Sequence, residues 1–220
     1  MSRSILSVSV IACLVLANCS SGGGGGGGSS SGLAGNPAAA KVVGVRNGQI
    51  SVSLNDTDYG AVSNSVGIVA YGGGVDSDRG QIVTASGYNK WGGVGRTVTS
   101  GTVTYDTDYG MQVASNISRS STTIRSDTVY QDSGNLTLTA NYGRGTLTGS
   151  DHIVDFDGTI SGQDVSGTVD VAYSTNGNTR NATMTTDLDG EIGSNGVIGT
   201  FNGVQGESAS VSGGFVGTAN

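Results

Sequence analysis

The sequence is poor in the residues from which small proteins build reactive sites. Its 220 residues include 2 Cys, 1 Pro and 1 His, and charged residues make up only 12%. A disulfide framework and a Cys/His metal site are therefore excluded. The 10 Lys and Arg are scattered singly and are outnumbered by 17 Asp and Glu, so the net charge is −7. A nucleic-acid partner, which needs clustered cations, is excluded as well.

Glycine is the residue that is present in excess, with 40 copies. One Pro and no G-x-y period exclude a collagen-like chain. The low charge density argues against an ordinary disordered polypeptide. The length predicts one or two domains.

The N-terminus carries a targeting signal. The apolar run 5–17 is shorter than the about 20 residues needed to span a bilayer as a helix. It ends in Leu16-Ala17-Asn18-Cys19, which resembles the lipobox of bacterial lipoprotein precursors, although Asn18 replaces the usual small residue. The resemblance implies that residues 1–18 are a cleaved signal peptide and that Cys19 is acylated. Ordinary secretory cleavage at another site is the alternative.

Residues 19–35 then comprise the acylated Cys19 and a Gly/Ser-rich tether. Such a segment behaves as a flexible coil that spans about 20–25 Å. Several acyl chains hold a protein durably on a membrane without a transmembrane helix. Ser20 after the Cys resembles lipoproteins sent to the Gram-negative outer membrane, so we expect a lipid-anchored, surface-exposed protein there. Since Cys13 lies in the signal, the mature body has no free thiol.

The rest of the chain is predicted to be all-β. Apolar and polar residues alternate in many short runs, such as 136–140 and 165–171, and no stretch of a dozen residues has helical spacing. Turn pairs such as Asn195-Gly196 and Asn202-Gly203 separate the runs. The pattern predicts about twelve strands in a closed barrel or sandwich. A transmembrane barrel is disfavoured because the aromatic residues, 5% of the chain, are too few for interfacial girdles.

Three segments carry a family resemblance. They are Gly101–Tyr105 (GTVTY), Leu136–Ser150 (LTLTANYGRGTLTGS) and Gly196–Thr218 (GVIGTFNGVQGESASVSGGFVGT). Their order resembles the C-terminal β-barrel of transferrin-binding protein B and related surface lipoproteins, in which a similar strand opens the barrel and two similar hairpins follow. The departures are Asn141-Tyr142, where Asp-Phe is usual, and a longer final hairpin.

The resemblance implies a soluble, antiparallel, eight-stranded up-and-down β-barrel over residues 101–220. Residues 36–100 would form a smaller, handle-like β region, and Phe201 and Phe215 would fill the barrel. It also implies a non-catalytic module that captures a protein or an iron- or haem-bearing ligand through inter-strand loops. We expect a monomer without a cofactor. No partner-binding residue is carried over, because the family's loops do not match.

Five Asp-x-Asp pairs are followed closely by Gly. They are Asp56/Asp58, Asp76/Asp78, Asp106/Asp108, Asp155/Asp157 and Asp187/Asp189. We interpret them as turn residues, because Asp bonds its own backbone in turns and Gly supplies positive φ. The alternative is calcium binding, since calcium takes oxygen ligands from Asp in Gly-containing loops.

The best candidate calcium ligands are Asp155, Asp157 and Asp164. Together with Gly158 they follow the spacing of a twelve-residue calcium loop, but Ile153 stands where the first ligand should be. The EF-hand interpretation therefore fails. A structural or adhesive surface protein with calcium-ordered Asp-Gly turns is the alternative function.

No enzymatic site is predicted. His152, the single histidine, would need a nucleophile and an orienting carboxylate, and a chain this rich in Ser does not single one out. We expect it in a hairpin loop with no role. Trp91, the single tryptophan, stands at a predicted hairpin tip, where it either anchors a partner or packs between sheets.

Overall fold

The computed structural model describes residues 42–46, 49–52, 57–76, 80–120, 123–176 and 179–220. The predicted signal peptide, Cys19 and the tether lie outside these residues. The described part contains thirteen strands and no helix, which confirms the all-β prediction. The strands are β1 (Val42–Arg46), β2 (Gln49–Val52), β3 (Thr57–Ser63), β4 (Gly67–Asp76), β5 (Gln81–Lys90), β6 (Thr102–Arg119), β7 (Ile124–Asn141), β8 (Thr146–Ser150), β9 (Val154–Ser161), β10 (Asp164–Ser174), β11 (Arg180–Ile192), β12 (Gly196–Gln205) and β13 (Ala209–Ala219).

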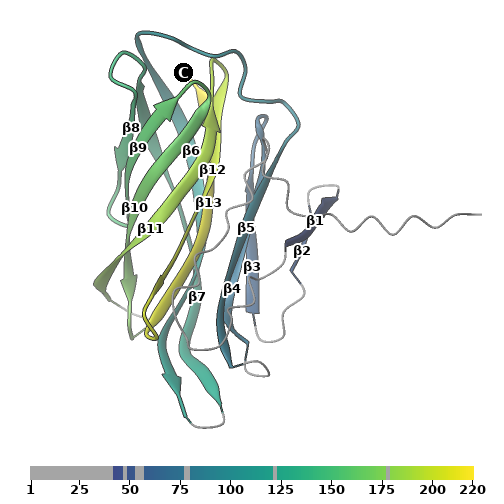
Figure 1. Cartoon of the computed structure of the whole chain (residues 1–220), viewed down its shortest axis with the longest axis vertical. Helices are drawn as coiled ribbons and strands as arrows, with labels where there is room; N and C mark the ends of the chain where they lie inside the picture. Colours follow the sequence, from purple (N-terminus) through teal and green to yellow (C-terminus); the bar gives the residue numbers. More distant parts are fainter. Residues whose placement is uncertain (1–41, 47–48, 53–56, 77–79, 121–122, 177–178) are drawn as a thin grey trace, which may run out of the picture.

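Strands β6 to β13 form a closed antiparallel barrel (Figure 1). Each strand pairs with the next along the chain, and β13 closes the wall by pairing with β6. The alternation of apolar and polar residues gives this wall a buried inner face and an exposed outer face, because successive side chains of a strand point to opposite faces. On β9, for example, Val154 and Phe156 are buried while Asp155 and Asp157 are exposed. The predicted eight-stranded up-and-down barrel is confirmed.

Aromatic side chains fill the interior of the barrel. Phe156 contacts Phe215 and Phe201 edge to face, with ring centroids 5.1 and 6.0 Å apart. Tyr105 and Tyr109 of β6 lie in the same cluster and are fully buried. Phe201 and Phe215 thus take the interior positions predicted for them. The core is packed with side chains, as is expected for a barrel of eight strands.

Two glycines explain how rings of this size fit between closely paired strands. A Cβ on Gly199 would lie 2.6 Å from the Phe215 ring, and one on Gly213 would lie 2.4 Å from the Phe201 ring. Each phenylalanine therefore covers a glycine of the neighbouring strand, and a larger residue there would displace the ring.

The turn predictions were partly right. The β7–β8 turn lies at 142–145, around the predicted Gly143–Gly145, and the β11–β12 turn includes Asn195. Asn202-Gly203, in contrast, lies inside β12 rather than in a turn. Asn202 is buried there under a second sheet, so its polar side chain serves a tertiary contact.

Strands β3, β4 and β5 form a separate three-stranded antiparallel sheet, here called the handle sheet. It lies beside the barrel (Figure 1) and contacts β6, β12 and β13. The handle sheet can approach the barrel closely because glycines stand at the contact. A Cβ on Gly214 would lie 2.1 Å from Val69, and one on Gly110 would lie 2.2 Å from the Tyr71 hydroxyl. Val69 and Tyr71 are both buried by this contact.

The contact between handle sheet and barrel is partly polar. Ser212 donates a hydrogen bond to the Ala85 carbonyl at 2.6 Å, and Asn202 donates one to the Ser86 hydroxyl. Gln112 on β6 is 1% exposed, and its amide has no partner among the described residues. Leaving such a group unpaired costs about 1–3 kcal/mol, so this contact is weaker than an apolar one of equal area.

Candidate functional site

The calcium candidates do not surround a common point. Asp155 and Asp157 project from the outer face of β9, and Asp164 begins β10 opposite Ser161. Ser161 lies four residues beyond Asp157, which corresponds to about 13 Å along a strand. Within the described residues no three His, Cys, Asp or Glu side chains are placed to hold a metal ion. Calcium binding stays a prediction.

The turn interpretation of the Asp-x-Asp pairs is wrong wherever the structure describes both members. These pairs lie inside strands: Asp106/Asp108 in β6, Asp155/Asp157 in β9 and Asp187/Asp189 in β11. The other two pairs lie partly outside the described residues. On a barrel an Asp that alternates with buried residues faces solvent. The glycine that follows permits close pairing: a Cβ on Gly190 would lie 2.6 Å from the Ile198 carbonyl.

These carboxylates make the outer face of β9, β10 and β11 strongly acidic. Asp155 stands directly opposite Asp170, and Asp164 directly opposite Glu191. Like charges in directly opposed positions destabilise a sheet. Asp189 faces solvent but is partly covered by its neighbours, and this partial burial raises its pKa, which the nearby carboxylates of Asp164 and Glu191 raise further. Asp189 therefore disfavours the folded state when it is ionised.

Asp189→Asn is expected to raise the thermal unfolding midpoint at pH 7. A raised pKa means that the folded state binds the proton more tightly than the unfolded state. The cost is therefore present above the folded pKa of Asp189, and it disappears as the pH falls below the unfolded pKa of about 3.9. The advantage of the variant should shrink to nothing at about pH 3. Calorimetry across this pH range measures it.

Asp187→Asn is the matched control, because it removes the same charge from the same face of β11. Asp164 and Glu191, the two carboxylates that act on Asp189, are one register step further from Asp187, which stands directly opposite the uncharged Thr168 and Asn202. An equal, pH-dependent gain from both variants would show that net charge, and not the surroundings of Asp189, is responsible.

One end of the barrel, here called the upper rim, is covered by the segment 91–101 that connects the handle sheet to β6 (Figure 1). This segment is held by the β11–β12 turn: Asn195 donates its N–H to the Val94 carbonyl at 2.8 Å, and Ser194 to the Arg96 carbonyl at 2.9 Å. The Gln163 amide of the β9–β10 turn donates to the Gly95 carbonyl at 3.0 Å.

Trp91 stands at the upper rim directly after β5. Its side chain is 54% exposed, and its indole N–H donates to the Asn64 carbonyl at 2.9 Å, which fixes the ring. The neighbouring Lys90 pairs with Glu191 of β11, which joins the handle sheet to the barrel. Of the two alternatives for Trp91, the structure favours the exposed one. A rigid, half-exposed tryptophan beside an ion pair is a suitable anchor for a protein partner.

The barrel wall has a second distinctive region, here called the seam. It is the interval between residues 127–135 of β7 and the β8–β9 loop at 151–153, together with the adjoining ends of β10 and β11. It exists because β8 is short: β7 pairs with β8 only from Thr139 to Asn141.

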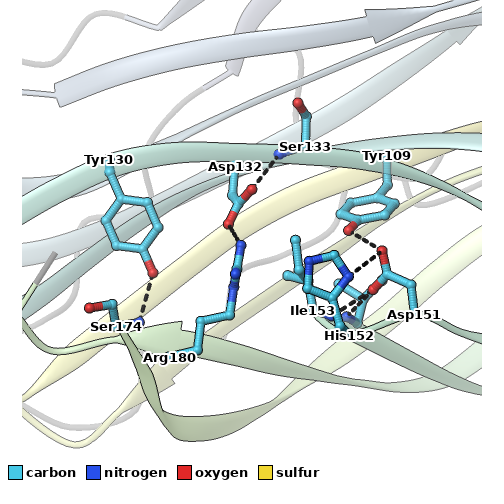
Figure 2. A network of polar contacts seen from close by, with 10 residues as sticks. Tyr109, Tyr130, Asp132, Ser133, Asp151, His152, Ile153, Ser174 and Arg180 are labelled. Atoms are coloured by element: carbon cyan, nitrogen blue, oxygen red, sulfur yellow. Dashed lines mark hydrogen bonds and ion pairs between the residues drawn. The ribbon is translucent and has the colours of Figure 1, made fainter. Parts of the chain in front are cut away.

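Side chains bridge the seam (Figure 2). Tyr109 donates its hydroxyl hydrogen to Asp151 Oδ2 at 2.6 Å, Ser174 donates its N–H to the Tyr130 hydroxyl at 2.8 Å, and Arg180 pairs with Asp132. Three polar contacts therefore close the wall where backbone pairing is missing.

Asp151 organises the β8–β9 loop. Burial acts to raise its pKa, but hydrogen bonds from the Tyr109 hydroxyl and from two backbone N–H groups outweigh it and hold the pKa below its usual value. Burial, together with the bond to Asp151, raises the pKa of Tyr109, so the phenol stays protonated and donates. His152 lies beside Asp151, with its Nδ1 3.9 Å from Oδ2, and its side chain is 76% exposed. It occupies the loop predicted for it.

Sequence reasoning missed the seam. The alternation over residues 128–140 was long enough to predict one extended strand, and β8 is visibly short between Gly145 and Asp151. Unequal strand lengths were therefore the available signal. The bridging residues themselves gave no signal in the sequence, because partners such as Asp132 and Arg180 are 48 residues apart in the chain.

Comparisons with known proteins give structural neighbours only. No protein-family model matches the chain, and no curated protein matches it in sequence. Among the described residues, no helix is long and apolar enough to cross a membrane.

Several solved structures of transferrin-binding protein B are structural neighbours of this chain. A variant from Haemophilus parasuis is 10% identical with a TM-score of 0.49, over 80% of this chain and 40% of that chain. The protein from serogroup B Neisseria meningitidis is 10% identical with a TM-score of 0.46, over 74% of this chain and 35% of that chain. This chain thus spans well under half the length of those proteins. We draw no ligand or partner from a likeness this distant.

Proposed function

We propose that the chain is a surface-exposed lipoprotein of the outer membrane that binds a macromolecular ligand without catalysis. Cys19 carries the acyl chains, and residues 20–35 form the tether. Residues 36–100 and 101–220 act as one handle-and-barrel module that works as a monomer. The lipobox-like sequence and the three family-like segments support this proposal.

The filled interior of the barrel is the observation that supports ligand binding on the outside of the barrel. Phe156, Phe201 and Phe215 are at most 1% exposed and occupy the space in which other barrels of about eight strands hold one small ligand. A ligand therefore has to be taken on the outside, by loops and exposed side chains. The upper rim offers Trp91, several loops and a rigid support, so we place the contact with the ligand there.

The ligand class follows from the sequence resemblance alone. Members of the resembled family bind proteins and iron- or haem-bearing carriers through loops. We therefore propose an iron- or haem-carrying protein as the ligand. Tryptophan contributes more than most residues at protein interfaces, since it buries a large area at little conformational cost.

The test is ligand binding to intact Gram-negative cells that make the full chain, with fluorescent iron-loaded transferrin and haemoglobin as probes. Trp91→Ala is expected to weaken binding of the recognised carrier by about thirtyfold, because an interface tryptophan contributes about 2 kcal/mol. Val129→Ala is the matched control, since Val129 is the other large exposed apolar side chain among the described residues, at 40%. It should bind like the parent.

Cys19→Ser in the same cells tests the anchor, and the protein should leave the cell surface. Surface display that survives this substitution contradicts lipidation at Cys19. Failure of both carriers to bind displayed protein contradicts the proposed ligand class, and full binding by Trp91→Ala contradicts the proposed contact at the upper rim.

A further inference from the structure

The contact between the handle sheet and the barrel is not uniform along its length. Near the upper rim it is apolar, because Val69 packs there against Ile198 and Val216. At the opposite end a second apolar cluster holds Val75 of β4 against Ile124 of β7. Between these clusters the contact is formed largely by polar side chains and glycines, so its middle is held less firmly than its ends.

Three side chains in this middle part are buried without a hydrogen-bond partner among the described residues. They are Gln112 of β6, Thr200 of β12 and Ser210 of β13, each 1% exposed. Each alternates with residues of the barrel core and so lies on the outer face, which β4 and β5 cover. Buried polar groups are nearly always paired in native proteins. An unpaired one favours any state in which water reaches it.

The chain passes from the handle sheet to the barrel at a glycine. Trp91 and Gly93 donate their N–H groups to the Val66 carbonyl of the loop between β3 and β4, at 3.2 and 3.3 Å, so they belong with the handle sheet. The next carbonyl, of Val94, accepts the N–H of Asn195 at 2.8 Å and belongs with the barrel. Gly93 has a φ of 72°, and a Cβ there would meet nothing within 4 Å. An uncrowded glycine between two bonded segments is a suitable hinge.

The polar contacts away from the hinge can be replaced by water. The hydrogen bonds that Ser212 and Asn202 donate to the handle sheet lie in the middle of the contact. At the far end, Arg119 of β6 donates to the Gly80 carbonyl in an exposed position. Exchanging such a bond for bonds to water costs little net free energy. The barrel does not depend on these contacts, because β6 and β13 close it by their own pairing.

We propose that the handle sheet opens from the barrel as one unit, by rotation at Gly93–Val94, while the barrel stays closed. Opening brings Gln112, Thr200 and Ser210 into water, which pairs their side chains. The handle sheet is then a hinged cover, and its position controls access to the outer face of β6, β12 and β13. Such openings below the free energy of global unfolding are a general property of weakly held structural units. This device does not depend on the ligand proposed for the upper rim.

The test is the rate at which a single introduced thiol reacts with dithiobis-nitrobenzoate, in the full chain carrying Cys13→Ser and Cys19→Ser. Ser210→Cys places the thiol under the handle sheet, and Val211→Cys places it one residue further on, in the barrel core. The first variant should react at least about tenfold faster, because its thiol needs only the handle sheet to open. Its rate should also depend less steeply on denaturant, since opening exposes less surface than unfolding.

Thr200→Cys tests whether the handle sheet moves as a unit, and it replaces Ser210→Cys if that variant does not fold. Thr200 and Ser210 lie on different strands under the same cover. One opening event uncovers both positions, so the two variants should react within about threefold of each other.

Gln112→Met, added to Ser210→Cys, tests the role of the unpaired amide. Methionine keeps the length of the side chain and removes the buried polar group, so the closed state should gain and thiol labelling should slow by about tenfold. Gln131→Met is the matched control, because Gln131 stands opposite Gln112 on β7 and is exposed. It should leave the labelling rate of Ser210→Cys unchanged.

Three outcomes contradict the proposal. One is equal labelling of Ser210→Cys and Val211→Cys, which would mean that only unfolding of the whole protein uncovers the contact. Another is fast labelling of Ser210→Cys without labelling of Thr200→Cys, which would leave local motion of one strand as the cause. The third is faster labelling in Gln112→Met, because the amide would then help to hold the handle sheet closed.

Discussion

Phe156→Ala is expected to lower the free energy of unfolding by about 3–5 kcal/mol, the usual cost of removing a buried phenylalanine ring. Phe156 is 1% exposed and is the ring that contacts both Phe201 and Phe215. Its removal leaves a cavity between two side chains that each cover a glycine of a neighbouring strand. Those rings cannot move inward without exposing Gly199 and Gly213, so the cavity is not expected to collapse.

Denaturant unfolding followed by far-UV circular dichroism measures this cost. Val129→Ala serves as the control, because Val129 is 40% exposed and surface substitutions usually change stability by within about 0.5 kcal/mol. The denaturant slope should be unchanged, so that the shift reports stability alone. A loss below about 1 kcal/mol for Phe156→Ala contradicts a core packed around this ring.

Gly214→Ala is expected to cost about 2–3 kcal/mol and to loosen the handle sheet from the barrel. The new Cβ would lie 2.1 Å from Val69 Cγ1 and 2.9 Å from the Gly199 carbonyl, so one of the two layers has to shift. The handle sheet should be the one that shifts, because its contact with the barrel is partly polar and contains the unpaired Gln112 amide. The part of the barrel wall that contains Gly214 is held by continuous backbone pairing of β13 with β12 and β6.

The single tryptophan separates the two layers experimentally. Trp91 fluorescence reports the handle sheet and upper rim, and circular dichroism reports mainly the barrel. In Gly214→Ala the fluorescence transition should occur at lower denaturant than the circular dichroism transition. Val69→Ala, which removes the clashing methyl group, should restore part of the loss, and the double-mutant cycle gives the coupling between the two sites. Gly143→Ala is the control, because its new Cβ would meet only the Asn141 side chain, at 3.5 Å. Independent, additive effects at 69 and 214 would contradict the proposed contact.

The alternation in the sequence was sufficient for the all-β class, and the family resemblance implied the eight-stranded up-and-down barrel. Alternation fixes which residues face inward, and the Gly143–Gly145 turn is a local signal that works without tertiary context. The family resemblance placed Phe201 and Phe215 inside the barrel. Alternation and turn signals depend on neighbours within a few residues, which is the range over which sequence patterns are informative.

The Asp-Gly and Asn-Gly pairs could not be interpreted correctly from sequence alone. Asp189-Gly190 and Asn202-Gly203 have the composition of turns, yet both lie within strands. Each glycine there relieves a contact with a neighbouring strand, and that neighbour is unknown until the pairing is known. The seam escaped prediction for a similar reason, because it depends on where β8 ends relative to β7.

The closure of the barrel has a consequence for how fast the chain can fold. β6 and β13 are adjacent in the wall, with Val113 opposite Val211, although 98 residues separate them in the chain. Every strand between them has to be synthesised before this pair can form, and a long loop has to be closed at the cost of chain entropy. Domains dominated by such distant contacts fold in milliseconds to seconds, and helical bundles fold much faster. Until β13 docks, both β6 and β12 have an open edge, and the incomplete sheet is at its most prone to aggregate.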